Sequence, residues 1–126
     1  MADAYRLFSE IYKETHLKQR KPPQNLASLK QYIDQNFTMP EIKISTLASI
    51  YKTSETYFRK EFKKYYGESL IEYIKRRRIE LACQLLRTEL YSITDVASRS
   101  GFESISYFSL EFKRYMGFSP STYRNL

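Results

Sequence analysis

One segment of the chain carries hydroxyl and basic side chains at the spacing of a helix face. Thr56, Arg59, Lys60 and Lys63 stand at positions i, i+3, i+4 and i+7, so a helix would present them on one stripe. A guanidinium group can donate two parallel hydrogen bonds to O6 and N7 of guanine, and an ammonium group pairs with phosphate. The pattern therefore favours contact with a nucleic acid, and Arg59 is the strongest candidate for recognising a base.

The opposite side of the same segment is aromatic. Phe58, Phe62 and the pair Tyr65–Tyr66 follow the helical period and predict an inward face. For one helix alone, a basic outer stripe is as well explained by simple solvation of Lys and Arg. The decision depends on whether the pattern occurs again.

It does occur again, fifty residues later. Residues 57–74 and 107–124 are identical at nine of eighteen positions, and the match extends backwards to Ile44/Ile93 and Ala48/Ala97. Such a self-match predicts one helical unit present twice. A short helix, a tight turn and a second helix with a polar outer stripe are typical of a helix-turn-helix unit, whose second helix enters a major groove. Two copies on a basic chain favour DNA binding over a solvated surface.

The second copy has a different outer stripe, formed by Ile105, Ser106, Ser109 and Leu110. An apolar side chain there can touch a thymine methyl group, and serine is a versatile but weak reader of bases. Basic residues return only at Lys113 and Arg114. We expect this unit to contribute phosphate anchoring and shape recognition more than sequence reading.

Capping residues and glycines predict an all-α fold of about seven helices. Asn25, Ser54, Ser69, Ser92 and Ser119 are the expected N-caps, and Gly67 and Gly117 close the two recognition helices. The expected helices cover residues 26–36, 44–51, 55–66, 70–87, 93–99, 103–116 and 120–123. We divide the chain into residues 1–24, a short helix and basic linker; 25–68, the first helix-turn-helix unit; 69–87, a linker helix; and 88–126, the second unit.

The linker helix spans roughly 28 Å at 1.5 Å per residue, close to one turn of B-DNA at roughly 34 Å. It can therefore hold the two recognition helices in successive major grooves. A head-to-tail repeat has no two-fold axis, so one chain should read an asymmetric site. The expected inner face consists of Leu70, Ile71, Ile74, the stem of Arg78, Leu81, Ala82, Leu85 and Leu86, with Arg78 pairing locally and Arg76 and Arg77 on the surface.

Phosphate contacts are expected from hydroxyl groups at the recognition-helix N-termini and from nearby basic side chains. The candidates are Ser54, Lys63, Lys64, Arg76, Arg77, Ser104, Lys113 and Arg114.

Composition excludes most other chemistry. The 126 residues carry a formal net charge of +7, with one cysteine and one histidine. An intramolecular disulfide is impossible. A single histidine and a single cysteine also leave almost no side chains for histidine-dependent catalysis or a Cys-based metal site. We expect no cofactor and no metal site. No apolar run reaches membrane-span length and the N-terminus lacks a signal-peptide block, so a cytoplasmic protein is expected.

Residues 93–124 carry the pattern I-x-D-V-A-x-x-x-G-F-x-S-x-S-Y-F-S-x-x-F-K-R-x-x-G-x-S-P-x-x-Y-R. With this motif, the chain resembles the DNA-binding domain of the AraC/XylS family of bacterial transcription regulators over residues 29–124. The resemblance implies seven helices in two helix-turn-helix units joined by a linking helix. Its base-reading positions fall on Thr56, Arg59 and Lys60 in the first unit, and on Ile105, Ser106, Ser109 and Leu110 in the second. Leu110 departs from the family, in which a basic residue is common at that position.

The resemblance also implies partners. They are double-stranded DNA with an asymmetric operator, RNA polymerase, and a sensing domain that in this family is commonly N-terminal. Residues 1–24 are too short for a sensing domain, so we interpret the chain as a DNA-binding fragment, with a stand-alone small regulator as the alternative. Activation is the favoured mode of regulation.

Three other classes of function compete with this interpretation. A non-specific architectural protein would bind DNA without sequence preference. A repair protein of the alkyl-accepting kind would need a reactive Cys83, which lies on a helix among Ala82 and Leu85 without a histidine partner. A helical repeat for protein interaction would leave the basic outer stripes without a purpose.

Overall fold

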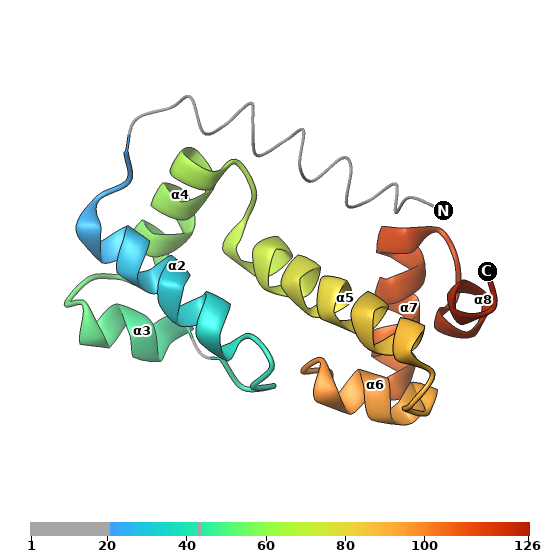
Figure 1. Cartoon of the computed structure of the whole chain (residues 1–126). Helices are drawn as coiled ribbons and strands as arrows, with labels where there is room; N and C mark the ends of the chain where they lie inside the picture. Colours follow the sequence, from blue (N-terminus) through green and yellow to red (C-terminus); the bar gives the residue numbers. More distant parts are fainter. Residues whose placement is uncertain (1–20, 43) are drawn as a thin grey trace.

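The computed structural model describes residues 21–42 and 44–126, which form seven helices and no strand. The all-α prediction is confirmed; the predictions for residues 1–20 lie outside the described part. The helices run in two groups along the chain (Figure 1): α2 Gln24–Asn36, α3 Ile44–Ile50, α4 Glu55–Tyr66, α5 Leu70–Thr88, α6 Ile93–Arg99, α7 Ile105–Met116 and α8 Pro120–Arg124.

Serine hydroxyl groups start five of the described helices. The side chains of Ser54 and Ser104 accept hydrogen bonds from the backbone N–H groups three residues later, at 3.0 and 3.2 Å. Ser69, Ser92 and Ser119 do the same for α5, α6 and α8. These bonds satisfy N–H groups that lack a partner within the helix, so the local sequence sets the helix starts. Gly67 and Gly117 end α4 and α7 in the left-handed conformation, as predicted.

Two predicted helix starts are wrong. The helix α7 begins at Ile105 rather than residue 103, because Ser104 provides the capping oxygen. Asn25 does not cap α2; Pro23 occupies the N-cap position without a side-chain hydrogen bond, and its carbonyl accepts from Ala27 at 3.0 Å. The fixed φ of proline directs the chain into the helix immediately after it.

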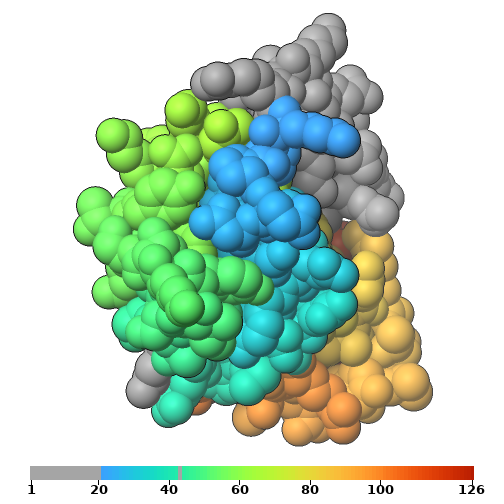
Figure 2. All heavy atoms as spheres, turned by 90° about the vertical axis from the view of Figure 1, so that its left-hand side faces the viewer, coloured from blue at the N-terminus to red at the C-terminus, as the bar shows by residue number. Residues whose placement is uncertain are grey.

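Two separate hydrophobic cores are joined by α5. The first is built from α2, α3, α4 and the N-terminal half of α5; the second from the C-terminal half of α5 with α6, α7 and Phe102. The first unit fills the face in Figure 2, where the later part of α5 and α6 appear only along its margin in gold and orange. Each core is centred on the predicted aromatic stripe, with Phe58, Phe62, Phe108 and Phe112 all 0% exposed.

The predicted inner face of α5 is partly wrong. Ile71 is 46% exposed, and Leu81 and Leu85 are only partly buried, whereas Tyr73, Ile79 and Cys83 are buried. The prediction of one continuous buried stripe on α5 is wrong because the helix presents one side to the first core and, about a turn later, a different side to the second core. Helical periodicity identifies one buried face and cannot separate two.

The two units also touch directly, at Gly101 in the turn between α6 and α7. A Cβ atom added at this glycine would lie 2.9 Å from the carbonyl oxygen of Phe37 at the end of α2 and 2.9 Å from Nε of Arg78. Its φ of 103° is also unfavourable for any residue with a side chain. The close approach fixes the second unit against the first. No helix in the described part of the chain is long and apolar enough to cross a membrane.

Candidate nucleic-acid interface

The outer face of α4 is an exposed surface of basic and hydroxyl side chains. Thr56, Arg59, Lys60, Lys63 and Lys64 are all exposed. Together with Ser69, Leu70 and Ile71 at the start of α5, they line an open hollow of about 580 Å³. The structure thus gathers all the side chains predicted for the first recognition helix, apart from the capping Ser54, along one hollow.

These cations are held only weakly by the protein itself. Arg59 lies 3.9 Å from Glu55, with both side chains almost half exposed. Lys64 lies 4.0 Å from Glu61 and 5.4 Å from the centre of the Tyr65 ring. Exposed ion pairs of this kind are worth at most about 1 kcal/mol. Both cations can therefore exchange a carboxylate for a phosphate or a base at little cost.

The outer face of α7 occupies the same positions in the repeat but differs in chemistry. Ile105 is 43% exposed and Leu110 is 69% exposed, while Ser106 is exposed and Ser109 partly buried. Lys113 is exposed one turn further along the helix. The second unit therefore presents a surface with two apolar groups and short hydroxyl side chains.

Arg114, predicted to contact phosphate, is bound to two carboxylates. Its Nε donates to Glu111 at 2.8 Å, and its Nη2 lies 3.2 Å from both carboxylate oxygens of Glu72 on α5. Glu111 is itself 7% exposed. This arrangement makes Arg114 a connection between α7 and α5, and leaves the exposed Lys113 as the better phosphate candidate on α7.

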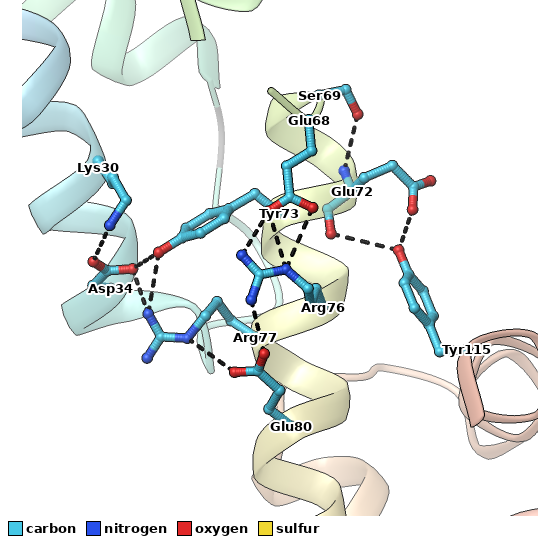
Figure 3. Close-up of polar contacts among 10 residues, drawn as sticks. All are labelled: Lys30, Asp34, Glu68, Ser69, Glu72, Tyr73, Arg76, Arg77, Glu80 and Tyr115. Carbon is cyan, nitrogen blue, oxygen red and sulfur yellow. Dashed lines mark hydrogen bonds and ion pairs between the residues drawn. The ribbon is translucent and has the colours of Figure 1, made fainter. Parts of the chain in front are cut away.

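Glu72 is the centre of this connection. The Tyr115 hydroxyl donates to its carboxylate (Figure 3), and Lys75 lies 3.9 Å from Glu72 and 3.5 Å from Glu111. Partial burial by itself raises the pKa of the Glu72 carboxyl, but the hydrogen bonds from Tyr115 and Arg114 outweigh it and hold the pKa below its ordinary value. The carboxylate therefore stays charged at neutral pH and fixes the second recognition helix on α5.

A second network holds the other side of α5 against α2. Asp34 accepts hydrogen bonds from Tyr73 and Arg77, and it pairs with Lys30 at 3.2 Å, as Figure 3 shows. In the same figure, Asp34 of α2 and Tyr115 of α7 approach α5 from opposite sides. The helix is thus tied to both units by polar contacts as well as by the two cores.

Arg78 reinforces the contact with α2. Its Nε donates to the Phe37 carbonyl at 2.7 Å and its Nη2 to the Met39 carbonyl at 2.9 Å. Burial lowers the pKa of this guanidinium group. The prediction that Arg78 lies partly buried is confirmed, but its partners are backbone groups about forty residues away rather than local side chains.

The surface placement predicted for Arg76 is wrong. This residue is 3% exposed, and its guanidinium donates to Glu68 at 2.6 Å and to Glu80 at 2.8 Å. Burial by itself lowers the pKa of Arg76, but the two carboxylates outweigh it and raise the pKa, so the group stays charged. Its donors are occupied inside the protein, and we do not retain it as a phosphate contact. Arg77 is partly buried and bound to Asp34.

The Glu72 network was missed in the sequence, although part of its signal is repeated there. Glu61 and Lys64 on α4 form the same i, i+3 pair as Glu111 and Arg114 on α7. The repeat therefore marked this pair as a feature of both units. Only the partner on α5 lay beyond sequence reasoning, because Glu72 and Arg114 are 42 residues apart.

Cys83 has no access to a substrate. It is 2% exposed within the second core, packed with Ala82, Leu86 and neighbouring apolar side chains. A reactive thiol requires an accessible, electropositive setting. In the described ranges, no group of three or more potential metal-ligating side chains comes together.

Known proteins with similar sequences are bacterial regulators. The sequence model of a helix-turn-helix domain family matches residues 47–126. The transcriptional activator AarP of Providencia stuartii is 34% identical over 93 residues, 74% of this chain and 68% of that protein. The activator RhaR of Pectobacterium atrosepticum is 44% identical over 66 residues, covering 52% of this chain and 23% of that protein. The chain spans 23–40% of the length of several curated relatives.

Solved structures share the fold. The C-terminal domain of AraT, a response regulator from Geobacillus stearothermophilus, superposes with a TM-score of 0.79 at 29% identity, covering 84% of this chain and 88% of that one. The DNA-binding domain of AdpA, solved in complex with a target DNA, gives a TM-score of 0.75 at 28% identity, covering 82% and 92%. The sequence match, the fold and the duplicated helix-turn-helix unit together show that the chain belongs to the AraC/XylS family of transcription regulators. Its described residues have the fold of that family's DNA-binding domain.

Proposed function

We propose that this chain binds double-stranded DNA in a sequence-specific manner, with α4 and α7 in two successive major grooves. The observation that carries the proposal is the exposed face of Thr56, Arg59 and Lys60 on α4, repeated in position on α7. The side chain of Arg59 is 45% exposed and only loosely paired, which leaves its fork of donors available for guanine.

The arrangement of the two helices supports one asymmetric operator. The 19 residues of α5 hold α4 and α7 apart, and polar networks on both sides of α5 keep their orientation. Because the units follow one another head to tail, the chain has no internal two-fold axis. One copy should therefore read two different base patches about 10 base pairs apart on one face of the duplex.

Phosphate contacts surround the two base-reading faces. Ser54 and Ser104 lie at the helix starts, where their oxygens accept backbone N–H groups and their O–H groups remain able to donate. Lys63 and Lys64 on α4 and Lys113 on α7 follow the base-reading positions by about one turn and are exposed. At that point a recognition helix leaves the base edges and approaches the backbone.

Replacing Arg59 with alanine tests the base-reading role. We expect Arg59→Ala to relax base choice at one operator position, at a cost of about 1–3 kcal/mol for a lost bidentate contact. Selection of bound fragments from random duplexes identifies the operator, and competition assays at fixed salt then measure preference at each position. Thr122→Ala, an exposed substitution on α8, is the control and should leave the base preference unchanged. Equal loss of affinity for operator and random duplex would show that Arg59 contacts phosphate only and does not read a base.

Salt dependence tests the two lysines at equivalent repeat positions. Lys63→Ala and Lys113→Ala are expected to weaken binding to all duplexes alike, and each should reduce the slope of log affinity against log salt by roughly one unit. Lys63→Arg and Lys113→Arg keep the charge and should keep the slope. A slope that is unchanged in both alanine variants would show that these lysines are merely solvated.

The role in transcription is a further part of the proposal. We assign activation, a cytoplasmic location, contact with RNA polymerase and a sensing domain in the longer protein, supported by family membership and by AarP and RhaR being named as activators. A reporter gene behind the selected operator distinguishes activation from repression. The competing architectural role predicts similar affinity for operator and random DNA. The alkyl-acceptor role is disfavoured by the burial of Cys83.

A further inference from the structure

We propose that α7 reads the 5-methyl groups of thymine through Leu110 and Ile105, so that the second half of the operator is selected by methyl contacts rather than by hydrogen bonds. The proposal rests on the proposed function, since it names the base feature that the second recognition helix contacts.

One part of the apolar surface, Leu110, lies where the first unit carries a reader, and Ile105 lies at the position of Glu55. In the repeat, Leu110 corresponds to Lys60 and Ser109 to Arg59. Leu110 is 69% exposed and Ile105 43% exposed, and the two lie five residues apart, about 140° around α7, at the two edges of the outer face that also carries the exposed Ser106. If α4 lies in a major groove, the same docking of the second unit presents Leu110 and Ile105 to base edges.

Other means of reading a base are scarce on this face. The fork of Arg114, which is the donor best suited to guanine, is held by Glu72 and Glu111. Lys113 lies a turn beyond the base-reading positions. The hydroxyl groups of Ser106 and Ser109 donate or accept equally, so they discriminate poorly. The one apolar group that the major groove presents is the C5-methyl of thymine.

A protein partner explains the same surface less well. Stable protein interfaces bury about 800 Å² on each side, with a contiguous apolar centre. On the outer face of α7, Leu110 and Ile105 are separated by exposed or partly buried hydroxyl side chains and followed by Lys113. Isolated apolar groups among hydroxyl and basic side chains suit a groove lined with methyl groups and phosphates.

Replacing thymine with deoxyuridine tests the proposal, because it removes the methyl group and nothing else. The probe is the selected operator with single substitutions in the α7 patch, titrated with the full chain at fixed salt. Each contacted thymine is expected to lose about fourfold in affinity, the ratio that burial of one methyl-sized group gives. Deoxyuridine outside both patches is the matched control and should have no comparable effect.

A variant assigns the effect to the side chain. Leu110→Ala should bind the normal operator more weakly and lose sensitivity to deoxyuridine at one position, and Ile105→Ala at another. Leu110 is exposed, so the variant is expected to fold, and its melting temperature checks this. In the reverse direction, 5-methylcytosine in place of cytosine at a contacted position should increase affinity.

Two results would overturn the inference while leaving the proposed function intact. The first is specific operator binding that is indifferent to deoxyuridine throughout the α7 patch. The second is a Leu110→Ala variant that keeps the deoxyuridine effect but loses association with a second copy or another protein, which would make this face a protein interface. The absence of any preferred operator would instead contradict the proposed function itself.

Discussion

Inserting five base pairs between the two contact patches of the operator is expected to abolish simultaneous binding of α4 and α7. The insertion turns the second patch by about half a helical turn, to the far side of the duplex. The chain cannot follow, because α5 is tied to α2 through Asp34 and to α7 through Glu72, and the units meet at Gly101. Affinity should fall to that of the first patch alone, by more than the roughly 16-fold that two methyl contacts of about fourfold each supply, because the phosphate contacts of α7 are lost as well.

A ten-base-pair insertion distinguishes a rigid connection from a flexible one. It restores the face of the duplex but moves the second patch away by about 34 Å. A flexible linker would recover much of the affinity, whereas the structure predicts no recovery. Titration and footprinting of the three operators measure this, with random duplex as the baseline. Full affinity for the ten-base-pair variant would contradict the rigid arrangement.

Truncation of the central phenylalanines is expected to have the largest effect on stability. Phe62 and Phe112 are 0% exposed at equivalent places in the two cores. Each packs in a tilted arrangement against a neighbouring ring, Phe62 against Tyr73 at 5.4 Å and Phe112 against Phe108 at 5.6 Å between ring centres. Replacing a buried Phe with alanine costs about 3–5 kcal/mol of stability, because the burial of the ring is lost and a cavity remains in its place. Each core is small, so either loss should unfold its unit.

Urea denaturation followed by circular dichroism measures these losses. Leu110→Ala is the matched control, since it truncates an apolar side chain on α7 that is 69% exposed and should change stability little. A midpoint for Phe62→Ala or Phe112→Ala near that of the control would mean that the aromatic stripes had been assigned to the wrong face.

The sequence alone determined which helices form and which faces of α4 and α7 are buried. Serine caps and the helical spacing of Phe58, Phe62, Phe108 and Phe112 are short-range signals, which depend on residues within two turns of each other. The internal repeat then indicated that one unit occurs twice, and it pointed to the exposed stripes of α4 and α7. The functional roles of those side chains remain predictions, which the experiments above test.

Only the tertiary structure decided how the units are joined. From the sequence we placed Arg76 on the surface, because a basic residue on a helix is usually solvated, and the sequence could not show which carboxylates bind Arg114. In the folded chain, carboxylates at positions 68, 72, 80 and 111 bind these two guanidinium groups. The change of buried face along α5 arises in the same way. Local pattern could not foresee it, because it depends on where two separate cores meet one helix, and the polar partners lie up to 43 residues apart in the sequence.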